Sequence, residues 1–157
     1  MQETTRVNLR YTDGRSEPVF AAAPVRADMS ARWNGVVLEY HRVPAMELEE
    51  HDIAEDHLVV RLGSTLKLTW KEGRAEKSKL LLPGTVSVYP AGPVSRCVWT
   101  QPSELLLFSI TREFFEQISG SEKPVELRPC RGAEDALVLE IARALSHCAR
   151  RSLALRE

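Results

Sequence analysis

The sequence predicts a mainly β protein, a closed or nearly closed barrel, followed by C-terminal helices. Three observations predict it. Between residues 35 and 110, short runs of apolar and β-branched residues alternate with polar ones, which is the period of a strand. Pro and Gly separate these runs, and these residue types mark tight turns. From about residue 133 onward the apolar residues recur at three- and four-residue steps instead, which is the period of a helix.

The composition limits the kind of protein. A chain of 157 residues is one domain with room for a hydrophobic core, and its 43% hydrophobic and 27% charged residues are typical of a soluble globular protein. The net charge of −1 argues against binding nucleic acid by this chain itself, because phosphate binding needs a surplus of Lys and Arg. No apolar run approaches the ~20 residues of a membrane span, and no signal-peptide pattern opens the chain. Three cysteines without close spacing fit neither a disulfide framework nor a metal knuckle. We therefore expect a cytoplasmic protein with reduced thiols and no membrane contact.

Residues 1–32 show no sustained period and are predicted to form an N-terminal arm. Asp13-Gly14 is a turn signal, and Val19-Phe20 is an isolated apolar pair in polar surroundings. We expect a frayed terminus that one hydrophobic anchor holds in place.

The barrel is predicted over residues 33–110. In its first strand, Val37, Glu39 and His41 share one face, and Leu38 and Tyr40 lie on the other. The residues KEGR at 71–74 predict a hairpin turn. The expected strands cover residues 35–43, 46–51, 57–62, 65–70, 76–82, 85–89, 96–99 and 103–110. About eight strands at short, regular spacing are typical of a barrel.

Residues 111–157 are predicted to be helical. Thr111 can cap a short helix that Gly120 ends. VELRPC, at residues 125–130, is predicted to be an extended link, and a second helix is predicted from about Ala133. Acidic residues lie at the start of that helix and arginines near its end, as the helix dipole favours.

The stretch LLLPGTVSVYPAGPVSRCVW, residues 80–99, carries a resemblance to a known family. It turns at Pro83-Gly84 and again at residues 90–93. With WNGVVLEYHRVPAMELEEH and DHLVVRLGSTLKLTW ahead of it, and SELLLFSITREFFEQI, VELRPC and AEDALVLEIARAL behind it, the chain resembles the cupin-like sensor domain at the N-terminus of AraC-type transcription regulators. The resemblance covers roughly Trp33 to Leu145.

The resemblance implies a cupin-like barrel, that is a double-stranded β-helix or jelly roll, followed by helices. It implies a ligand pocket over which the N-terminal arm can fold, and a dimer contact made by the terminal helix. The implied function is that of an effector-sensing and dimerisation domain and not of an enzyme. The family's two helix-turn-helix units are absent from this sequence, so DNA is expected to be bound only by a domain outside this chain.

The histidines do not follow the pattern of a metal-binding cupin. Such a cupin offers His-x-His, a Glu a few residues on, and another His after the second Pro-Gly turn, and these side chains hold a divalent metal. Here His51 and His57 are six residues apart, and PVSRCVW contains no His. The sequence therefore predicts no metal, no other cofactor and no catalytic residue. We expect His51 to be solvated and His57 to form a hydrogen bond at a strand end.

Polar and aromatic side chains on otherwise apolar strands are the candidates for a ligand pocket. Arg61 interrupts an apolar strand, so its charge must reach solvent, a carboxylate partner or a ligand anion. Arg96 would suit an acidic effector, because its guanidinium matches a carboxylate. The alternative for each arginine is a salt bridge outside the barrel, and the alternative for the tryptophans is a place in the core. The predicted ligand-binding residues are His41, His57, Arg61, Trp70, Tyr89, Arg96 and Trp99.

Two further side chains are predicted to have structural roles. Cys97 is expected to be a small buried core residue, since nothing in the sequence pairs it with a base. His41 and Glu39 are expected to form a hydrogen bond at the surface or in the pocket.

The terminal helix carries an apolar stripe that either covers the barrel or pairs with its mate in a second subunit. We predict a homodimer whose interface includes Leu137, Ile141, Leu145 and Cys148. The other predicted partner is a small-molecule effector, and an acidic one would suit the arginines.

Two other functions stay open. The chain could be a stand-alone cupin enzyme, such as an isomerase or a metal-dependent dioxygenase, and the metal content of the purified protein would test this. It could also be a ligand-free scaffold that only dimerises, in which case a metabolite screen would produce no thermal shift.

Overall fold

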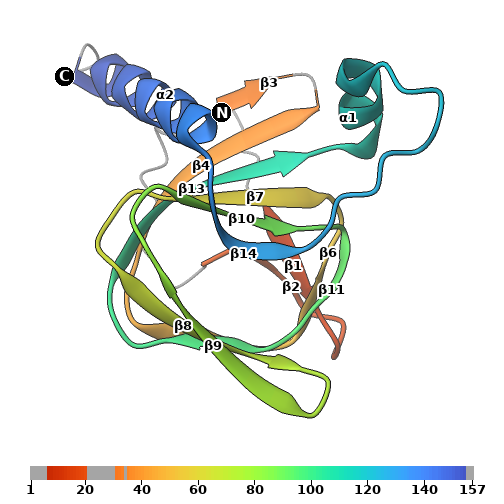
Figure 1. The fold of residues 1–157 in the computed structure, drawn as a ribbon, viewed down its shortest axis with the longest axis vertical. Helices are drawn as coiled ribbons and strands as arrows, with labels where there is room; N and C mark the ends of the chain where they lie inside the picture. The colour runs from red at the N-terminus through yellow and green to blue at the C-terminus, as the bar shows by residue number, and fades with distance from the viewer. Residues whose placement is uncertain (1–6, 21–30, 34, 155–157) are drawn as a thin grey trace.

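The computed structural model describes residues 7–20, 31–33 and 35–154. Most of these residues form antiparallel strands that close around one interior, and a long helix lies outside the ring of strands (Figure 1). The predicted fold class, a mainly β barrel followed by helices, is confirmed. No helix among these residues has the length and apolar character needed to cross a membrane.

The strands form three hydrogen-bonded sheets. The largest has the order β14 (Cys130–Glu134), β10 (Thr85–Tyr89), β7 (Asp56–Arg61), β13 (Ser103–Ile110), β4 (Val36–Val43) and β3 (Ala31–Trp33). A second, across the interior from the first, has the order β5 (Met46–Leu48), β12 (Cys97–Trp99), β8 (Leu66–Glu72) and β9 (Ala75–Leu81). The third has the order β11 (Gly92–Val94), β6 (His51–Ile53), β1 (Asn8–Tyr11) and β2 (Ser16–Pro18).

The long strands agree well with the sequence, and so does the short strand β12, which lies within the predicted 96–99, but other short strands do not. β10 and β13 have the predicted bounds, 85–89 and 103–110. The predicted strand 46–51 is correct only for residues 46–48, because the chain breaks after β5 and begins β6 at His51. β6 and β11 pair with each other within stretches expected to be a loop and a turn. β6 and β11 have three residues each, too few to display an alternating pattern, so only their pairing reveals them.

Residues 7–20 form an N-terminal hairpin that belongs to the barrel. β1 pairs with β2 around the predicted Asp13-Gly14 turn, and β1 also pairs with β6. Val19 and Phe20 lie in the barrel core. The expectation of a frayed terminus is therefore wrong for residues 7–20, and residues 1–6 and 21–30 lie outside the described part.

The register of the six-stranded sheet decides which side chains face the interior. Leu105 of β13 lies opposite His41 of β4 on one side and opposite Arg61 of β7 on the other. These residues face into the barrel, while their neighbours Tyr40 and Leu106 belong to a separate core on the outer face of the same sheet. The predicted division of the first strand into two faces is confirmed.

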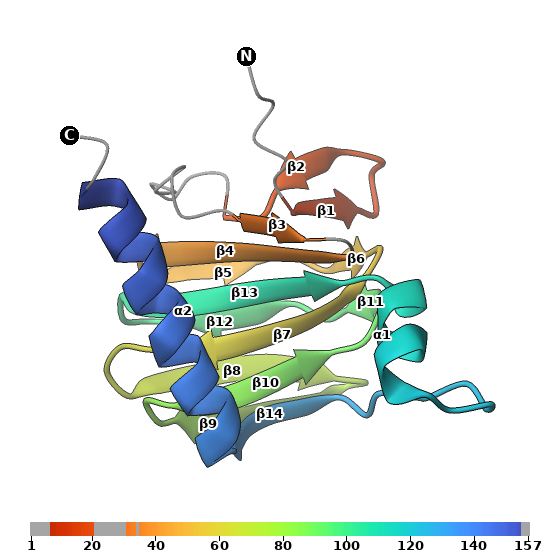
Figure 2. The same ribbon diagram turned by 90° about the horizontal axis from the view of Figure 1, so that it is seen from above.

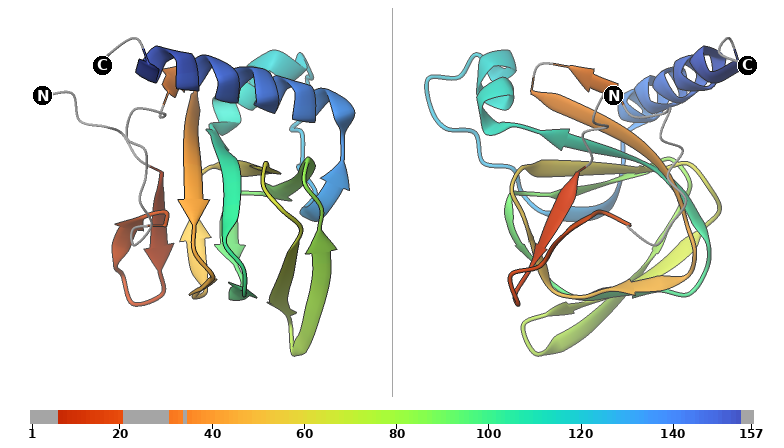
Figure 3. Two further views of the ribbon diagram at one scale, coloured as in Figure 1. Left: turned by 90° about the vertical axis from the view of Figure 1, so that its left-hand side faces the viewer. Right: turned by 180° about the vertical axis from the view of Figure 1, so that it is seen from behind.

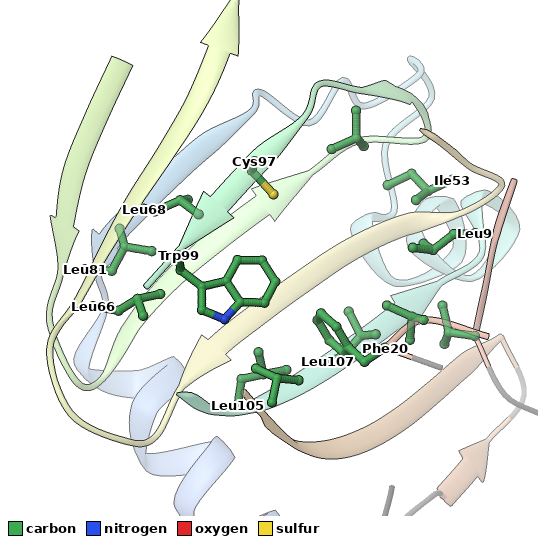
Figure 4. Packing of buried hydrophobic residues seen from close by; sticks show 14 residues of the cluster. Leu9, Phe20, Ile53, Leu66, Leu68, Leu81, Cys97, Trp99, Leu105 and Leu107 are labelled. Atoms are coloured by element: carbon green, nitrogen blue, oxygen red, sulfur yellow. The ribbon is translucent and has the colours of Figure 1, made fainter. Parts of the chain in front are cut away.

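The interior is packed mainly with aliphatic and aromatic side chains. Figure 4 shows Trp99 projecting between the walls of the barrel, with Leu66, Leu81 and Leu105 around it. The ring of Phe20 meets the Trp99 ring edge-on, with 6.1 Å between their centroids. The hairpin therefore contributes to the same core as the sheets.

Helix α2 (Ala136–Ala154) covers the outer face of the six-stranded sheet. Figures 2 and 3 show it lying across the strands outside the barrel. Asp135 caps its first turn by accepting hydrogen bonds from the backbone N–H groups of Leu137 and Val138, at 3.0 Å each. Ala142, which is fully buried, and Leu145 pack against the sheet.

Helix α1 (Arg112–Ser119) has the predicted caps. Thr111 accepts a hydrogen bond from the N–H of Phe114, and Gly120 ends the helix with a φ of 59°. Gly35 lies against this helix with a φ of 83°, and a Cβ there would be 2.5 Å from the Cβ of Phe114. Only glycine allows that backbone conformation and that approach together.

Candidate functional site

The barrel encloses a cavity of about 90 Å³. It is smaller than the ~150 Å³ cavity that holds benzene in another protein. Most of its wall is aliphatic, and the described residues that line it include no Asp and no Glu. The polar exceptions are His51, His57, Arg61, Ser87, Tyr89, Cys97 and Ser103. The cavity is therefore an apolar space with a few polar groups, the usual character of a small-molecule site.

Four of the predicted ligand-binding residues line this cavity: His57, Arg61, Tyr89 and Trp99. The structure places His41, Trp70 and Arg96 elsewhere, as described below. The indole Nε1 of Trp99 donates to the carbonyl of Pro44 at 2.9 Å, which fixes the ring in the wall.

Arg61 is the most unusual of these residues, because its charge lies inside the barrel. The residue is 6% exposed, and its guanidinium Nη1 donates to the hydroxyl of Ser103. Its Nε has no hydrogen-bond partner, and no described carboxylate forms an ion pair with it. Burial lowers the pKa of Arg61, and the nearby Tyr89 hydroxyl opposes that effect. An arginine nevertheless remains a cation at neutral pH.

Tyr89 interacts with two guanidinium groups. The charge of Arg61 acts on its hydroxyl, and Arg131 of β14 lies 5.5 Å from the centroid of the Tyr89 ring. The guanidinium carbon of Arg131 also lies over the Trp70 ring, 4.4 Å from its centroid. Trp70, a predicted ligand residue, therefore makes a cation–π contact and does not line the cavity. Burial is the largest cause of the raised pKa of Tyr89, which keeps its hydroxyl protonated. No signal in the sequence pointed to Arg131, because it follows the stretch predicted to be an extended link.

His51 is buried, which corrects the expectation that it is solvated. It is 4% exposed, and its Nδ1 lies 2.7 Å from the carbonyl oxygen of Glu49. Tyr11 lies opposite His51 in the register of β1 and β6. The Tyr11 ring meets the imidazole edge-on, with 6.2 Å between the ring centroids. The acidic neighbours in the sequence are exposed, but pairing with the N-terminal hairpin removes His51 from solvent.

His57 lines the cavity and is held uncharged by its surroundings. Burial lowers its pKa to about 4, and His51 adds to that effect. Its ring nitrogens form no hydrogen bond with any of the described residues, so the expected hydrogen bond is not found. A neutral imidazole facing the cavity can donate or accept one hydrogen bond to a ligand.

His41 and Glu39 form a fully buried pair on the inner face of β4, and neither lines the cavity. Both side chains are 0% exposed, and His41 Nε2 lies 2.8 Å from Glu39 Oε2. Glu39 Oε1 accepts a hydrogen bond of 2.6 Å from the backbone N–H of Val7. The ring of Phe20 packs edge-on against the imidazole of His41, with 4.9 Å between the ring centroids. The expected hydrogen bond exists, and it serves to hold the N-terminal hairpin.

Arg96 lies outside the barrel. It forms a two-point contact with Glu47, in which Nη2 lies 2.8 Å from Oε2, and both side chains are largely exposed. The salt bridge outside the barrel, which was the alternative for this arginine, is therefore present.

Cys97 is a buried residue of the core, as expected. Burial raises the pKa of its thiol to about 11, so it stays protonated at neutral pH. Within residues 7–20, 31–33 and 35–154, no three His, Cys, Asp or Glu side chains are grouped so that they could hold a metal ion.

The predicted dimer residues of α2 fall on two faces. Leu145 packs against the sheet, whereas Leu137 is 69% exposed and Ile141 49% exposed. Cys148 is exposed as well. The exposed residues leave an apolar stripe on the helix that the barrel does not cover.

No protein-family model and no curated protein matches this sequence. Solved structures that match include a cupin-superfamily protein from Desulfitobacterium hafniense, with 16% identity, a TM-score of 0.42, and coverage of 52% of this chain and 72% of that one. A cupin domain from Bordetella pertussis has 17% identity and a TM-score of 0.44, over 68% of this chain and 97% of that one. An oxalate decarboxylase from Bacillus subtilis has 15% identity and a TM-score of 0.40, over 49% of this chain and 21% of that one. Identities and TM-scores this low carry no information about the function of this chain.

Proposed function

We propose that this chain is the effector-sensing and dimerisation domain of an AraC-type transcription regulator. The observation that most supports this is the small cavity inside the barrel. The N-terminal hairpin contributes Leu9 and Val19 to its wall, and Arg61 places an unpaired charge at its edge. A pocket with these features suits a small molecule better than it suits a purely structural core.

The six-stranded sheet gives a physical route from the pocket to the helix. Inward-facing Arg61 and Leu105 line the cavity, while Val60 and Leu106, their neighbours along the same strands, pack under α2. A ligand that moves β7 or β13 therefore also changes the surface on which α2 rests. The ligand must bind one of the two arrangements more tightly, because only differential affinity shifts such an equilibrium.

The exposed stripe of α2 is the proposed contact with a second copy of the chain. Leu137, Ile141, Ala144 and Cys148 are spaced by four, three and four residues, which is the spacing of a coiled-coil seam. In this proposal the helix links the pocket to the dimer, and the dimer sets the spacing of DNA-binding heads outside this chain. The DNA-controlling part is supported by the sequence resemblance alone.

The test of this proposal is the gene product in its own cell. We would sequence the reading frame past Glu157 and measure the intact mass of the native protein. The proposal expects a frame that continues into two helix-turn-helix units. A frame that stops at Glu157, with the mass of the 157-residue chain, would contradict it, and stoichiometric metal in that protein would favour a stand-alone cupin enzyme.

A further inference from the structure

We propose that the barrel cavity binds a short-chain monocarboxylate, with its carboxylate on the guanidinium of Arg61 and its alkyl tail among aliphatic side chains. This inference rests on the proposed function, because it assigns the chemical class of the effector in the same pocket. Four features of the described residues support it, and they are taken in turn.

The first feature is the position of Arg61. It lies opposite Leu105 in the register of β7 and β13, and Leu105 faces the interior. Along β7, Val59 and His57 face the same way and line the cavity with it. The side chain is therefore directed into the barrel by the strand itself, and with 6% exposure it has little access to bulk water.

The second feature is the lack of an acidic partner for this charge among the described residues. Glu39, a fully buried carboxylate on the same inner face, is engaged by His41 and by the backbone N–H of Val7. Arg61 makes a hydrogen bond with Ser103, which is neutral, and its Nε is unpartnered. The guanidinium therefore has unused donors. Burying an unpaired cation costs free energy, and a ligand anion on these donors would reduce that cost.

The third feature is the sign of the charge around the cavity. The lining residues contain an arginine and two histidines but no carboxylate, and Arg131 lies on the Tyr89 ring. A guanidinium binds a carboxylate through two parallel hydrogen bonds, which a neutral ligand cannot reproduce. The pocket therefore favours an anion with two oxygens in one plane.

The fourth feature is the size and apolar character of the remaining space. Leu66, Leu81 and Leu105 face the interior around Trp99 (Figure 4), and all four residues line the cavity. A volume of about 90 Å³ accommodates a tail of roughly two to four carbons including the carboxyl carbon. A second carboxylate on the ligand would be buried against leucines without a partner, which argues for a monocarboxylate.

The binding experiment uses propionate as the probe and isothermal titration calorimetry on the 157-residue chain. We expect propionate to bind and propionamide, which has the same shape without the charge, not to bind. Arg61→Met should weaken propionate binding by about 10- to 100-fold, the range for losing charged hydrogen bonds. Arg96→Met is the matched control, because Arg96 is exposed and paired with Glu47 outside the barrel, and it should leave the affinity unchanged.

The unfolding of the same variants tests whether Arg61 serves the ligand or the fold. Without propionate, Arg61→Met should be at least as stable to urea as the unsubstituted chain, because it removes an unpaired buried charge. Arg61→Lys keeps the charge but not the planar fork, and it should fold and bind propionate more weakly than the unsubstituted chain.

Four results would overturn the inference. They are no binding of propionate to the unsubstituted chain, equal binding to Arg61→Met, inorganic phosphate binding as tightly as propionate, or Arg61→Met and Arg61→Lys both unfolded. None of these results bears on the reading frame or the dimer. Conversely, a protein that binds propionate but has no DNA-binding heads would support this inference and contradict the proposal that the chain belongs to a regulator.

Discussion

Arg61 and Arg96 show how much the face of a strand matters for a single residue. Both are polar residues on apolar strands, and the sequence made both of them candidates for an acidic ligand. Arg61 shares the inward face of β7 with Val59, so its guanidinium lies at the cavity. Arg96 immediately precedes the inward-facing Cys97, so it points outward and pairs with Glu47. A shift of one position along a strand changes the partner of a charge from a surface carboxylate to a buried hydroxyl.

His57 makes the stability of the barrel dependent on pH. Its pKa of about 4 in the folded chain lies below the ordinary value of 6.5, so between these values the unfolded chain binds the proton and the folded chain does not. The free energy of unfolding should therefore fall as the pH falls from about 6.5 to about 4, by about 2 kcal/mol between pH ~7.5 and pH ~5.

Urea unfolding at several pH values, in a buffer free of carboxylates, measures this dependence. His57→Gln should remove most of it, whereas His147→Gln, which changes an exposed histidine, should not. An unchanged pH dependence in His57→Gln would show that other groups cause it.

At the scale of elements, both ends of the N-terminal hairpin are held by one buried pair. Val7 donates to Glu39 at the start of the hairpin, and Phe20 packs on His41 at its end. A backbone hydrogen bond from Val19 to Val7 joins the two ends. The hairpin contributes cavity-lining side chains, so we expect loosening of the pair on β4 to open that side of the cavity.

Removing the Glu39 carboxylate should loosen the hairpin before the rest of the barrel. Glu39→Ala leaves His41 and the Val7 N–H without their partner, and breaking a buried pair of this kind costs about 3–5 kcal/mol. Hydrogen exchange should rise in residues 8–18 more than in β7 and β13.

Two variants control this experiment. Glu39→Gln keeps a side chain that can bond to both partners and should lose less stability than Glu39→Ala. Glu47→Ala removes an exposed carboxylate from the Arg96 pair and should change stability little. Equal losses in Glu39→Ala and Glu47→Ala would refute the anchoring role of Glu39.

At the scale of the whole molecule, one sheet separates a cavity from a helix. Its inner face lines the cavity, and its outer face packs under Ala142 and Leu145 of α2. Another side of α2 presents Leu137 and Ile141 to solvent. Large exposed apolar side chains at heptad spacing on one helix are typical of a surface that another helix covers.

The dimer proposal predicts that a charge on this stripe separates the subunits. Ile141→Glu should convert a dimer to a monomer in sedimentation velocity, because it places a carboxylate in an apolar contact. The thermal stability of the monomer should change little, since Ile141 is already 49% exposed. His147→Glu adds the same charge at an exposed position beside the stripe and should remain dimeric. A dimer that survives Ile141→Glu would place the interface elsewhere.

The sequence was sufficient for the local features of the fold. Alternation over five to eight residues predicted β10 and β13, and the caps Thr111 and Gly120 predicted α1, because these signals depend only on neighbours along the chain. The candidate site was predictable in part for the same reason. Residues that break an apolar pattern, such as Arg61 and Tyr89, stand out before any pairing is known.

Tertiary structure decided the rest. The sequence by itself determined a barrel followed by helices, and it separated the two faces of each long strand. It could not determine that β1 covers His51, that Arg131 reaches Trp70, or that Arg61 and not Arg96 faces the cavity. The physical reason is that a period of two divides side chains between faces, but only pairing with distant strands decides which face is enclosed.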